Sequence, residues 1–172
     1  MEHQAKGPLN LYLWYNTIME DLKRFLIEAK KNTYANAKAK KVASSRPGSK
    51  DYEYTDGTYI YHDTYFGKTF FIGEEVVYKV GEEKPIWGMN YYGITLDEDL
   101  ADEAVAEGLR PALMLVGEDN TIPVRGPKTF KNGNYSYSFE AEGDLSSFSG
   151  LELIYKAGKK ICELKCFGGK II

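Results

Sequence analysis

The feature that most constrains the fold of this chain is a change to period-two alternation at Asp51, which continues through a series of short turns. Successive side chains of a strand point to opposite faces, so such alternation is typical of β-strands. The pattern predicts strands near 52–55, 58–66, 69–72, 74–80 and 85–92, with hairpin turns at Gly67-Lys68 and Gly81-Glu82-Glu83. Pairing between sequence neighbours indicates an antiparallel meander.

The stretch "YIYHDTYFG" gives one of these strands an unusual face. Three tyrosines and a carboxylate share one parity: Tyr59, Tyr61, Asp63 and Tyr65. The segment 85–92 is apolar or aromatic on both faces, with Trp87 on one and Tyr92 on the other. A sheet with one face in water alternates more cleanly. We therefore expect a curved sheet that encloses a core or an aromatic-lined cleft.

The C-terminal part of the chain returns to strands. "NYSYSFEA" alternates three aromatic residues with Ser136, Ser138 and Glu140, and we expect the aromatic residues to face the core: Tyr135, Tyr137 and Phe139. "LELIYKAGKKICELKCF" predicts a hairpin that turns at Gly158.

Two segments have helical spacing. Apolar residues recur over 18–31, and Thr17 with Glu20 fits a capping box, which predicts an amphipathic helix. A second, acidic helix is expected after Thr95, with a C-terminal cap at Gly108.

Together these patterns predict an α+β fold. Its centre would be a curved antiparallel meander, open or barrel-like, packed by the N-terminal helix and the acidic helix. Residues 1–16 are interpreted as a leader or added segment, and 17–172 as a single domain.

Composition and spacing argue against several classes of protein. A net charge of −3 gives no reason to expect nucleic acid or an anionic membrane as partner. No apolar run approaches the roughly 20 residues of a membrane span. On one strand, Cys162 and Cys166 would lie roughly 13 Å apart, too far for a disulfide. We therefore expect two free thiols and a cytoplasmic protein.

The aromatic strands are the best candidates for a binding site. Their rings and polar tips suit a cleft that holds a small, partly polar molecule. The candidate ligand-binding residues are Tyr59, Tyr61, Asp63, Tyr65, Trp87, Asn90, Tyr91 and Arg125. No nucleotide-binding, catalytic or metal-binding motif is present in the sequence. We expect no cofactor and assign no catalytic residue or metal ligand.

Each polar candidate also has a structural interpretation. Asp63 would either orient a ligand or be a structural carboxylate held by backbone amides, a tyrosine hydroxyl or Arg125. Arg125, between turn residues in "PVRGPK", would either bind an anionic ligand or tie down its loop. His62 points away from Asp63 on a regular strand, so the two cannot form a dyad.

Residues 32–51 form a basic segment with a Pro-Gly turn. We interpret it as a solvated, mobile connector in preference to an anion-binding flap.

Several motifs resemble those of an uncharacterised prokaryotic domain family that occurs alone or fused behind helix-turn-helix DNA-binding domains. They are "MEDLKRFLIEAKKNTYA", "YIYHDTYFG", "GEEVVY", "PIWGMNYYG", "LRPALM", "VRGP" and "SGLELIYKAGKKICELKCFGG". The resemblance runs from about Met19 to the end and implies no catalytic activity. The fusions imply a sensory or dimerising module, although this chain itself has no room for a helix-turn-helix before it.

Three functions remain open from the sequence. The favoured one is binding of a small molecule, linked to regulation. The second is an enzyme acting on a small polar metabolite, with Asp63 as general acid or base. The third is a dimerisation or protein-interaction module that uses the aromatic face as its interface, for example in a homodimer.

Overall fold

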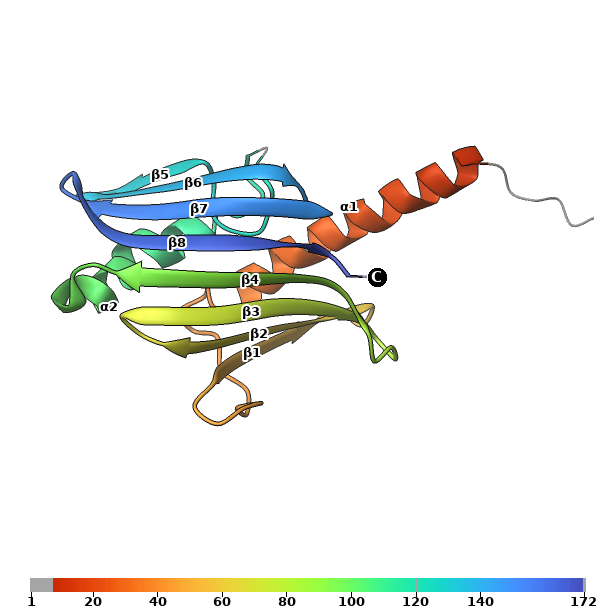
Figure 1. The fold of residues 1–172 in the computed structure, drawn as a ribbon, viewed down its shortest axis with the longest axis horizontal. Coiled ribbons are helices and arrows are strands. Elements are labelled where there is room, and N and C mark those ends of the chain that lie inside the picture. The colour runs from red at the N-terminus through yellow and green to blue at the C-terminus, as the bar shows by residue number, and fades with distance from the viewer. Residues whose placement is uncertain (1–7, 120, 172) are drawn as a thin grey trace, which may run out of the picture.

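The computed structural model describes residues 8–119 and 121–171, and side chains from residue 19 on. Eight strands form one antiparallel sheet in the order β1-β2-β3-β4-β8-β7-β6-β5 (Figure 1). They are β1 (Lys50–Thr55), β2 (Tyr59–Gly67), β3 (Phe70–Lys79), β4 (Pro85–Thr95), β5 (Thr129–Asn132), β6 (Tyr135–Asp144), β7 (Ser147–Lys156) and β8 (Lys159–Lys170). The sheet is open, with β1 and β5 at its edges, so the barrel-like form is not adopted.

The helical residues fall into two groups. The first is the long helix α1 (Pro8–Asn32). The second, called here the helical segment, runs without a break through η1 (Glu98–Leu100), α2 (Ala101–Glu103), η2 (Ala104–Leu109) and α3 (Arg110–Leu113). Its central part, η2, is a π-helix.

Both groups lie on the same face of the sheet (Figure 1). The end of α1 covers β1 and β2, while the helical segment covers β6 and β7. Fully buried side chains from each layer, such as Leu26 of α1, Trp87 of β4 and Ile154 of β7, belong to one hydrophobic core. The α+β fold expected from the sequence is confirmed.

The sheet consists of two meanders that meet at one pairing. The first meander runs through β1–β4 and the second through β5–β8. They are joined by antiparallel pairing of β4 with β8, in which Trp87 is opposite Lys170 and Thr95 is opposite Cys162.

The expected hairpins and faces are confirmed in the second meander. Ala157 and Gly158 both have positive φ, 47° and 81°, as the tight turn between β7 and β8 requires. On β6, three aromatic residues are buried while Glu140 is exposed: Tyr135, Tyr137 and Phe139. The serines between them are partly buried.

The first meander departs from the sequence pattern in one respect. The predicted strands 69–72 and 74–80 are one continuous strand, β3, which passes through Gly73. That glycine makes room for a side chain from the next strand, as described below.

The helix boundaries differ more. α1 begins at Pro8, so Thr17 lies inside it and is not an N-cap, and residues 8–16 continue the helix instead of preceding it. Residues 1–7 of the expected leader lie outside the described part. Thr95 ends β4, and Gly108 lies inside the helical segment. A Cβ at Gly108 would come within 2.8 Å of Ile154, so this glycine allows close packing on the sheet.

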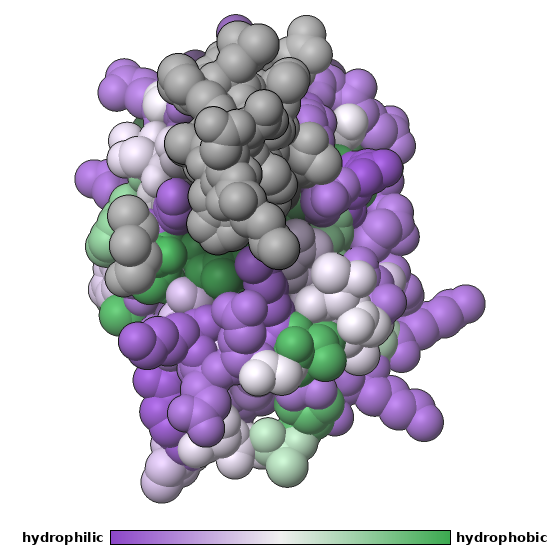
Figure 2. Space-filling model, turned by 90° about the vertical axis from the view of Figure 1, so that its right-hand side faces the viewer, coloured by the Kyte–Doolittle hydropathy of each residue, from purple (hydrophilic) through white to green (hydrophobic). Residues whose placement is uncertain are grey.

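Both cysteines are free and buried, as predicted. Burial raises the pKa of Cys162 to about 11 and that of Cys166 to about 12. Among the described residues, no helix is both long and apolar enough to cross a bilayer. Viewed from the end where α1 leaves the sheet, the coloured surface is mainly hydrophilic, with small separate hydrophobic areas (Figure 2).

Candidate functional site

A cavity of about 390 Å³ lies between the helix-covered face of the sheet, the end of α1 and the helical segment. Strands β1, β2, β3, β4, β7 and β8 contribute to its walls. Its size is at the lower end of the range for small-molecule sites. The lining combines tyrosine rings and aliphatic side chains with several ionisable groups.

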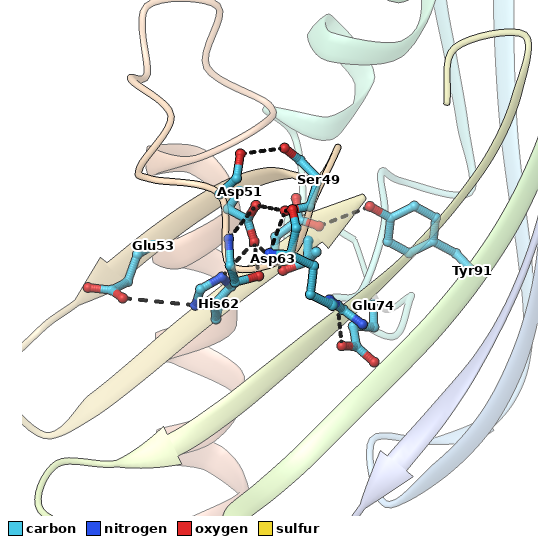
Figure 3. Close-up of polar contacts among 11 residues, drawn as sticks. Ser49, Asp51, Glu53, His62, Asp63, Glu74 and Tyr91 are labelled. Atoms are coloured by element: carbon cyan, nitrogen blue, oxygen red, sulfur yellow. Dashed lines mark hydrogen bonds and ion pairs between the residues drawn. The ribbon is translucent and has the colours of Figure 1, made fainter. Parts of the chain in front are cut away.

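The cavity floor contains a hydrogen bond that spans three strands. Tyr91 of β4 donates from its hydroxyl to Oδ1 of Asp63 on β2, with an O–O distance of 2.9 Å (Figure 3). The tyrosine ring passes over β3 at Gly73, where an added Cβ would lie 2.4 Å from its hydroxyl. The absence of a side chain at Gly73 therefore allows Tyr91 to reach Asp63.

A second carboxylate lies beside Asp63. Glu75 is directly opposite Asp63 in the β2–β3 register, and each is only 3% exposed. Lys30 enters from α1 and forms a buried ion pair with Glu75. The Lys30 ammonium also lies 5.7 Å from the ring centroid of Tyr61, close enough for a cation–π contact.

This environment changes the acidity of Asp63. Burial first, and then the charge of Glu75, raise the pKa of the Asp63 carboxyl to about 7. The hydrogen bond from Tyr91 and the charges of Lys30 and Arg125 act in the opposite direction. Asp63 is therefore a carboxyl group that changes its charge near neutral pH inside a cavity.

Aromatic rings and further cations also line the cavity. Tyr34, just after α1, and Tyr65 of β2 make an edge-to-face contact with centroids 5.7 Å apart. The guanidinium of Arg110 lies 5.1 Å from the Tyr34 centroid, and the ammonium of Lys50 lies 5.4 Å from the Tyr65 centroid. Burial raises the pKa of Tyr34 to about 12, so its hydroxyl stays protonated.

Arg110 has an incomplete set of hydrogen bonds. It lies within hydrogen-bonding range of the Tyr52 hydroxyl. Its Nε is buried and has no acceptor among the described residues. Arg110 follows directly after the π-helix η2, and π-helical turns are frequent at functional sites.

Arg125 lines the cavity but is already engaged. Its Nε and Nη2 each donate to Glu152 at 2.7 Å, and both residues are buried. Tyr137 also donates to Glu152, at 2.8 Å, and accepts a bond from the backbone N–H of Gly126. This bidentate pair attaches the loop before β5 to strand β7. Arg125 therefore has the structural role, in which it ties down its loop, and its acceptor is a carboxylate.

An exposed ion pair is also part of the cavity lining. Lys68, in the β2–β3 turn, reaches Asp102 of the helical segment at 3.1 Å. Both side chains are more than half exposed.

The structure also contains a polar cluster on the opposite face of the sheet, which the sequence analysis did not identify. The carboxylate of Asp51 is completely buried and accepts hydrogen bonds from Ser45, Ser49 and Thr64 (Figure 3). His62 Nε2 lies 3.0 Å from Oδ1 of Asp51. The serines bond to the carboxylate and not to the imidazole, so the cluster is not arranged as a nucleophile–base pair.

The Asp51 cluster explains how the basic segment is held. Burial alone would raise the pKa of Asp51, but its hydrogen bonds, led by Ser49 and Thr64, hold it well below the usual value. These hydrogen bonds attach residues 44–51 to the sheet, although the residues from Lys40 to Gly48 are themselves exposed.

Five of the eight predicted ligand-binding residues line the cavity: Tyr61, Asp63, Tyr65, Tyr91 and Arg125. Tyr59 packs against Phe25 of α1, with centroids 5.2 Å apart. Trp87 is completely buried and donates to the carbonyl of Leu145.

Asn90, which was also predicted to bind a ligand, does not line the cavity. It is exposed and lies between Met89 and Tyr91, which are buried, and therefore points to the other face. His62, by contrast, points away from Asp63 as predicted and contacts Asp51.

Several cavity residues that carry a charge or an aromatic ring were missed, among them Lys30, Tyr34, Lys50, Glu75 and Arg110. Lys30 did leave a signal, because it continues the apolar i, i+4 series of Leu22 and Leu26. A charged residue on the apolar stripe of a helix indicates a buried partner.

The described residues hold no group of three His, Cys, Asp or Glu side chains that could bind a metal ion. The cavity thus offers carboxyl, ammonium, guanidinium and phenol groups together with aromatic rings. This arrangement can bind and orient a small organic molecule and can exchange a proton through Asp63.

The fold and site together define a class of protein: an open antiparallel sheet whose helix-covered face holds a polar and aromatic cavity. The chain belongs to the DUF5680 family, a domain of unknown function, whose model matches residues 63–171. The match begins at Asp63 and includes β3 to β8 with the helical segment, but not α1. No curated protein and no solved structure matches the chain.

Proposed function

We propose that this protein binds a small, partly polar molecule in the cavity beneath α1 and the helical segment. The observation that carries the proposal is the enclosure of ionisable side chains, Asp63 and Arg110 among them, by aromatic walls. Sites for small molecules typically combine an apolar lining with a few placed polar groups.

The chemistry of the lining supports binding more directly than its shape. A structural core would leave few donors unmatched, because unpaired buried polar atoms are destabilising. Arg110 Nε lacks an acceptor among the described residues, and Asp63 accepts a side-chain bond from Tyr91 although a carboxylate has room for several. A ligand would complete both sets of bonds.

The binding would have a sensory purpose, linked to transcriptional regulation. The resemblance to domains fused behind helix-turn-helix regions supports this role. The two free thiols fit a reducing compartment, which supports a cytoplasmic location.

A cavity-filling variant tests the proposal. Val105 of η2 lines the cavity and is partly buried, and Val105→Trp would fill much of the space. A library of small metabolites is screened by thermal shift and calorimetry against the parent, Val105→Trp and a control, Val80→Trp. Val80 is half exposed and does not line the cavity.

We expect at least one compound to stabilise the parent and Val80→Trp but not Val105→Trp. The proposal fails if every compound that binds does so equally well to Val105→Trp. It also fails if the library stabilises none of the three proteins.

A second candidate function is an enzyme that uses Asp63 as general acid or base. The specific observation in its favour is the pKa of about 7, which suits proton transfer at neutral pH. Glu75 lies beside it and forms a buried ion pair with Lys30.

This candidate is tested on any compound found by the screen. Incubation with the parent protein would convert the compound, and Asp63→Asn would abolish conversion while still binding it. Recovery of the unchanged compound after prolonged incubation would rule out the enzyme, and binding would be the only remaining function.

A further inference from the structure

We infer that the ligand is a small planar carboxylate that also carries a hydrogen-bond donor. Its carboxylate would lie between Arg110 and Lys50, and its donor would reach Asp63. This inference rests on the proposed function and adds the chemical class of the ligand.

The first step is the balance of charge in the cavity. Five cationic side chains line it: Lys30, Lys50, Lys68, Arg110 and Arg125. Three of them are paired with Glu75, Asp102 and Glu152, respectively. Within the described part of the chain, Lys50 and Arg110 have no carboxylate within ion-pairing distance.

The second step is that these two cations are on one side of the cavity. Arg110 lies over Tyr34 and Lys50 over Tyr65, and the two rings contact each other. The ammonium of Lys50 makes only a 3.4 Å contact with the carbonyl of Gly67. A guanidinium and an ammonium on two rings that contact each other can share a single carboxylate.

The third step is the unmet donor of Arg110. Its Nε is shielded from solvent and has no acceptor among the described residues. A carboxylate bound side-on to a guanidinium accepts from Nε and a terminal nitrogen together, as Glu152 does with Arg125. A ligand carboxylate would give Arg110 the same arrangement.

The fourth step concerns the part of the cavity around Asp63. Asp63 accepts from Tyr91 and lies beside Glu75, so oxygen acceptors dominate there. A ligand hydroxyl or N–H there would donate to Asp63. A second ligand carboxylate would meet two acidic residues and be repelled.

The fifth step is the lining and size of the cavity as a whole. Rings of Tyr34, Tyr61, Tyr65 and Phe71 line it, and its volume of about 390 Å³ admits a small metabolite. Flat rings offer the best contact to a planar body.

The test uses matched pairs of planar acids and their primary amides, from para-hydroxybenzoate to indoleacetate, with phenyl phosphate and tyramine as further probes. Dissociation constants are measured by calorimetry on the full chain. We expect at least one acid with a donor to bind tenfold or more tightly than its amide and than phenyl phosphate.

Charge-matched variants locate the anion. Arg110→Gln should reduce the preference for acid over amide by at least tenfold, whereas Arg24→Gln, at an exposed α1 position, should leave it unchanged. If Arg110→Gln fails to fold, the preference for acid over amide is measured on Lys50→Gln instead. Asp63→Asn should weaken the hydroxylated acid more than plain benzoate.

The outcomes separate this inference from the proposed function. If amides or tyramine bind as tightly as acids and Val105→Trp prevents it, the cavity binds a ligand but not an anion, and the inference is overturned. Tighter binding of phenyl phosphate would replace the carboxylate with a phosphate and overturn it as well. If no probe binds, the inference fails, and the metabolite screen decides the proposed function. If probes bind but Val105→Trp changes nothing, both proposals fail.

Discussion

An added Cβ at Gly73 would lie 2.4 Å from the hydroxyl oxygen of Tyr91, within the space that this side chain occupies on its way to Asp63. One missing side chain on β3 therefore determines which residues meet on the cavity floor.

Gly73→Ala should displace the Tyr91 ring and break its bond to Asp63. Overpacking of this kind costs about 1–3 kcal/mol, and loss of a bond to a buried acid adds about 1–3 kcal/mol. Urea denaturation measures the change. Gly88→Ala is the control, since its nearest contact would be a milder 3.1 Å to Ile171, and an equal loss there would contradict the explanation.

Asp63→Asn should flatten the dependence of stability on pH. The folded pKa of about 7 lies above the ordinary value of 3.8. The native state therefore holds its proton more tightly, and wild-type stability falls as the pH rises from about 4 to 7. The amide in the variant does not titrate. Between pH 4 and pH 8, the free energy of unfolding of Asp63→Asn should therefore increase by on the order of 2–4 kcal/mol relative to that of the parent.

Urea unfolding at both pH values checks this dependence. Parallel curves for the parent and Asp63→Asn would mean that Asp63 titrates normally in the folded protein.

Asp51→Ala should destabilise the protein by about 3–5 kcal/mol at pH 7, because it removes the common acceptor of a buried hydrogen-bond cluster. The folded pKa is depressed, so the carboxylate stabilises the protein above its unfolded pKa. This stabilisation is lost as the pH falls below about 4, so the parent and variant should converge in acid. Glu53→Ala, at an exposed position on the same strand, should cost little at any pH.

Lys30 and Glu75 should behave as a coupled buried pair. Lys30→Met or Glu75→Leu alone leaves one charge unmatched in the core and should cost about 3–5 kcal/mol. The double variant Lys30→Met/Glu75→Leu should cost clearly less than the sum.

The exposed pair Lys68 and Asp102 is the control for that cycle, with an expected coupling of about 0–1 kcal/mol. Additive effects at Lys30 and Glu75 would show that the two groups stabilise the fold independently.

The strands and their inward faces could be predicted because period two is a local property. Parity alone placed Tyr61, Asp63 and Tyr65 on the face that lines the cavity. The same rule could not place Asn90, because 85–92 is apolar on both faces and either parity could have been the inner one.

The partners across the cavity could not be predicted from the sequence. Lys30 and Glu75 meet only because α1 crosses β3, and no local pattern encodes that crossing. Arg110 was missed for a different reason. Gly108 looked like the end of a helix, whereas the π-helical turn continues past it and carries Arg110 to the cavity wall.

The pairing of β4 with β8 also has a consequence for how the chain folds. It is the one pairing in the described sheet between strands that are not consecutive in the chain. Even the paired residues with the smallest sequence separation, Thr95 and Cys162, are far apart in sequence. Closing so long a loop is entropically unfavourable and slow compared with forming local hairpins. The two meanders can therefore form first and join afterwards. Since the cavity is lined from both sides of this junction, a ligand would bind only after the meanders have joined, and its presence would slow their separation.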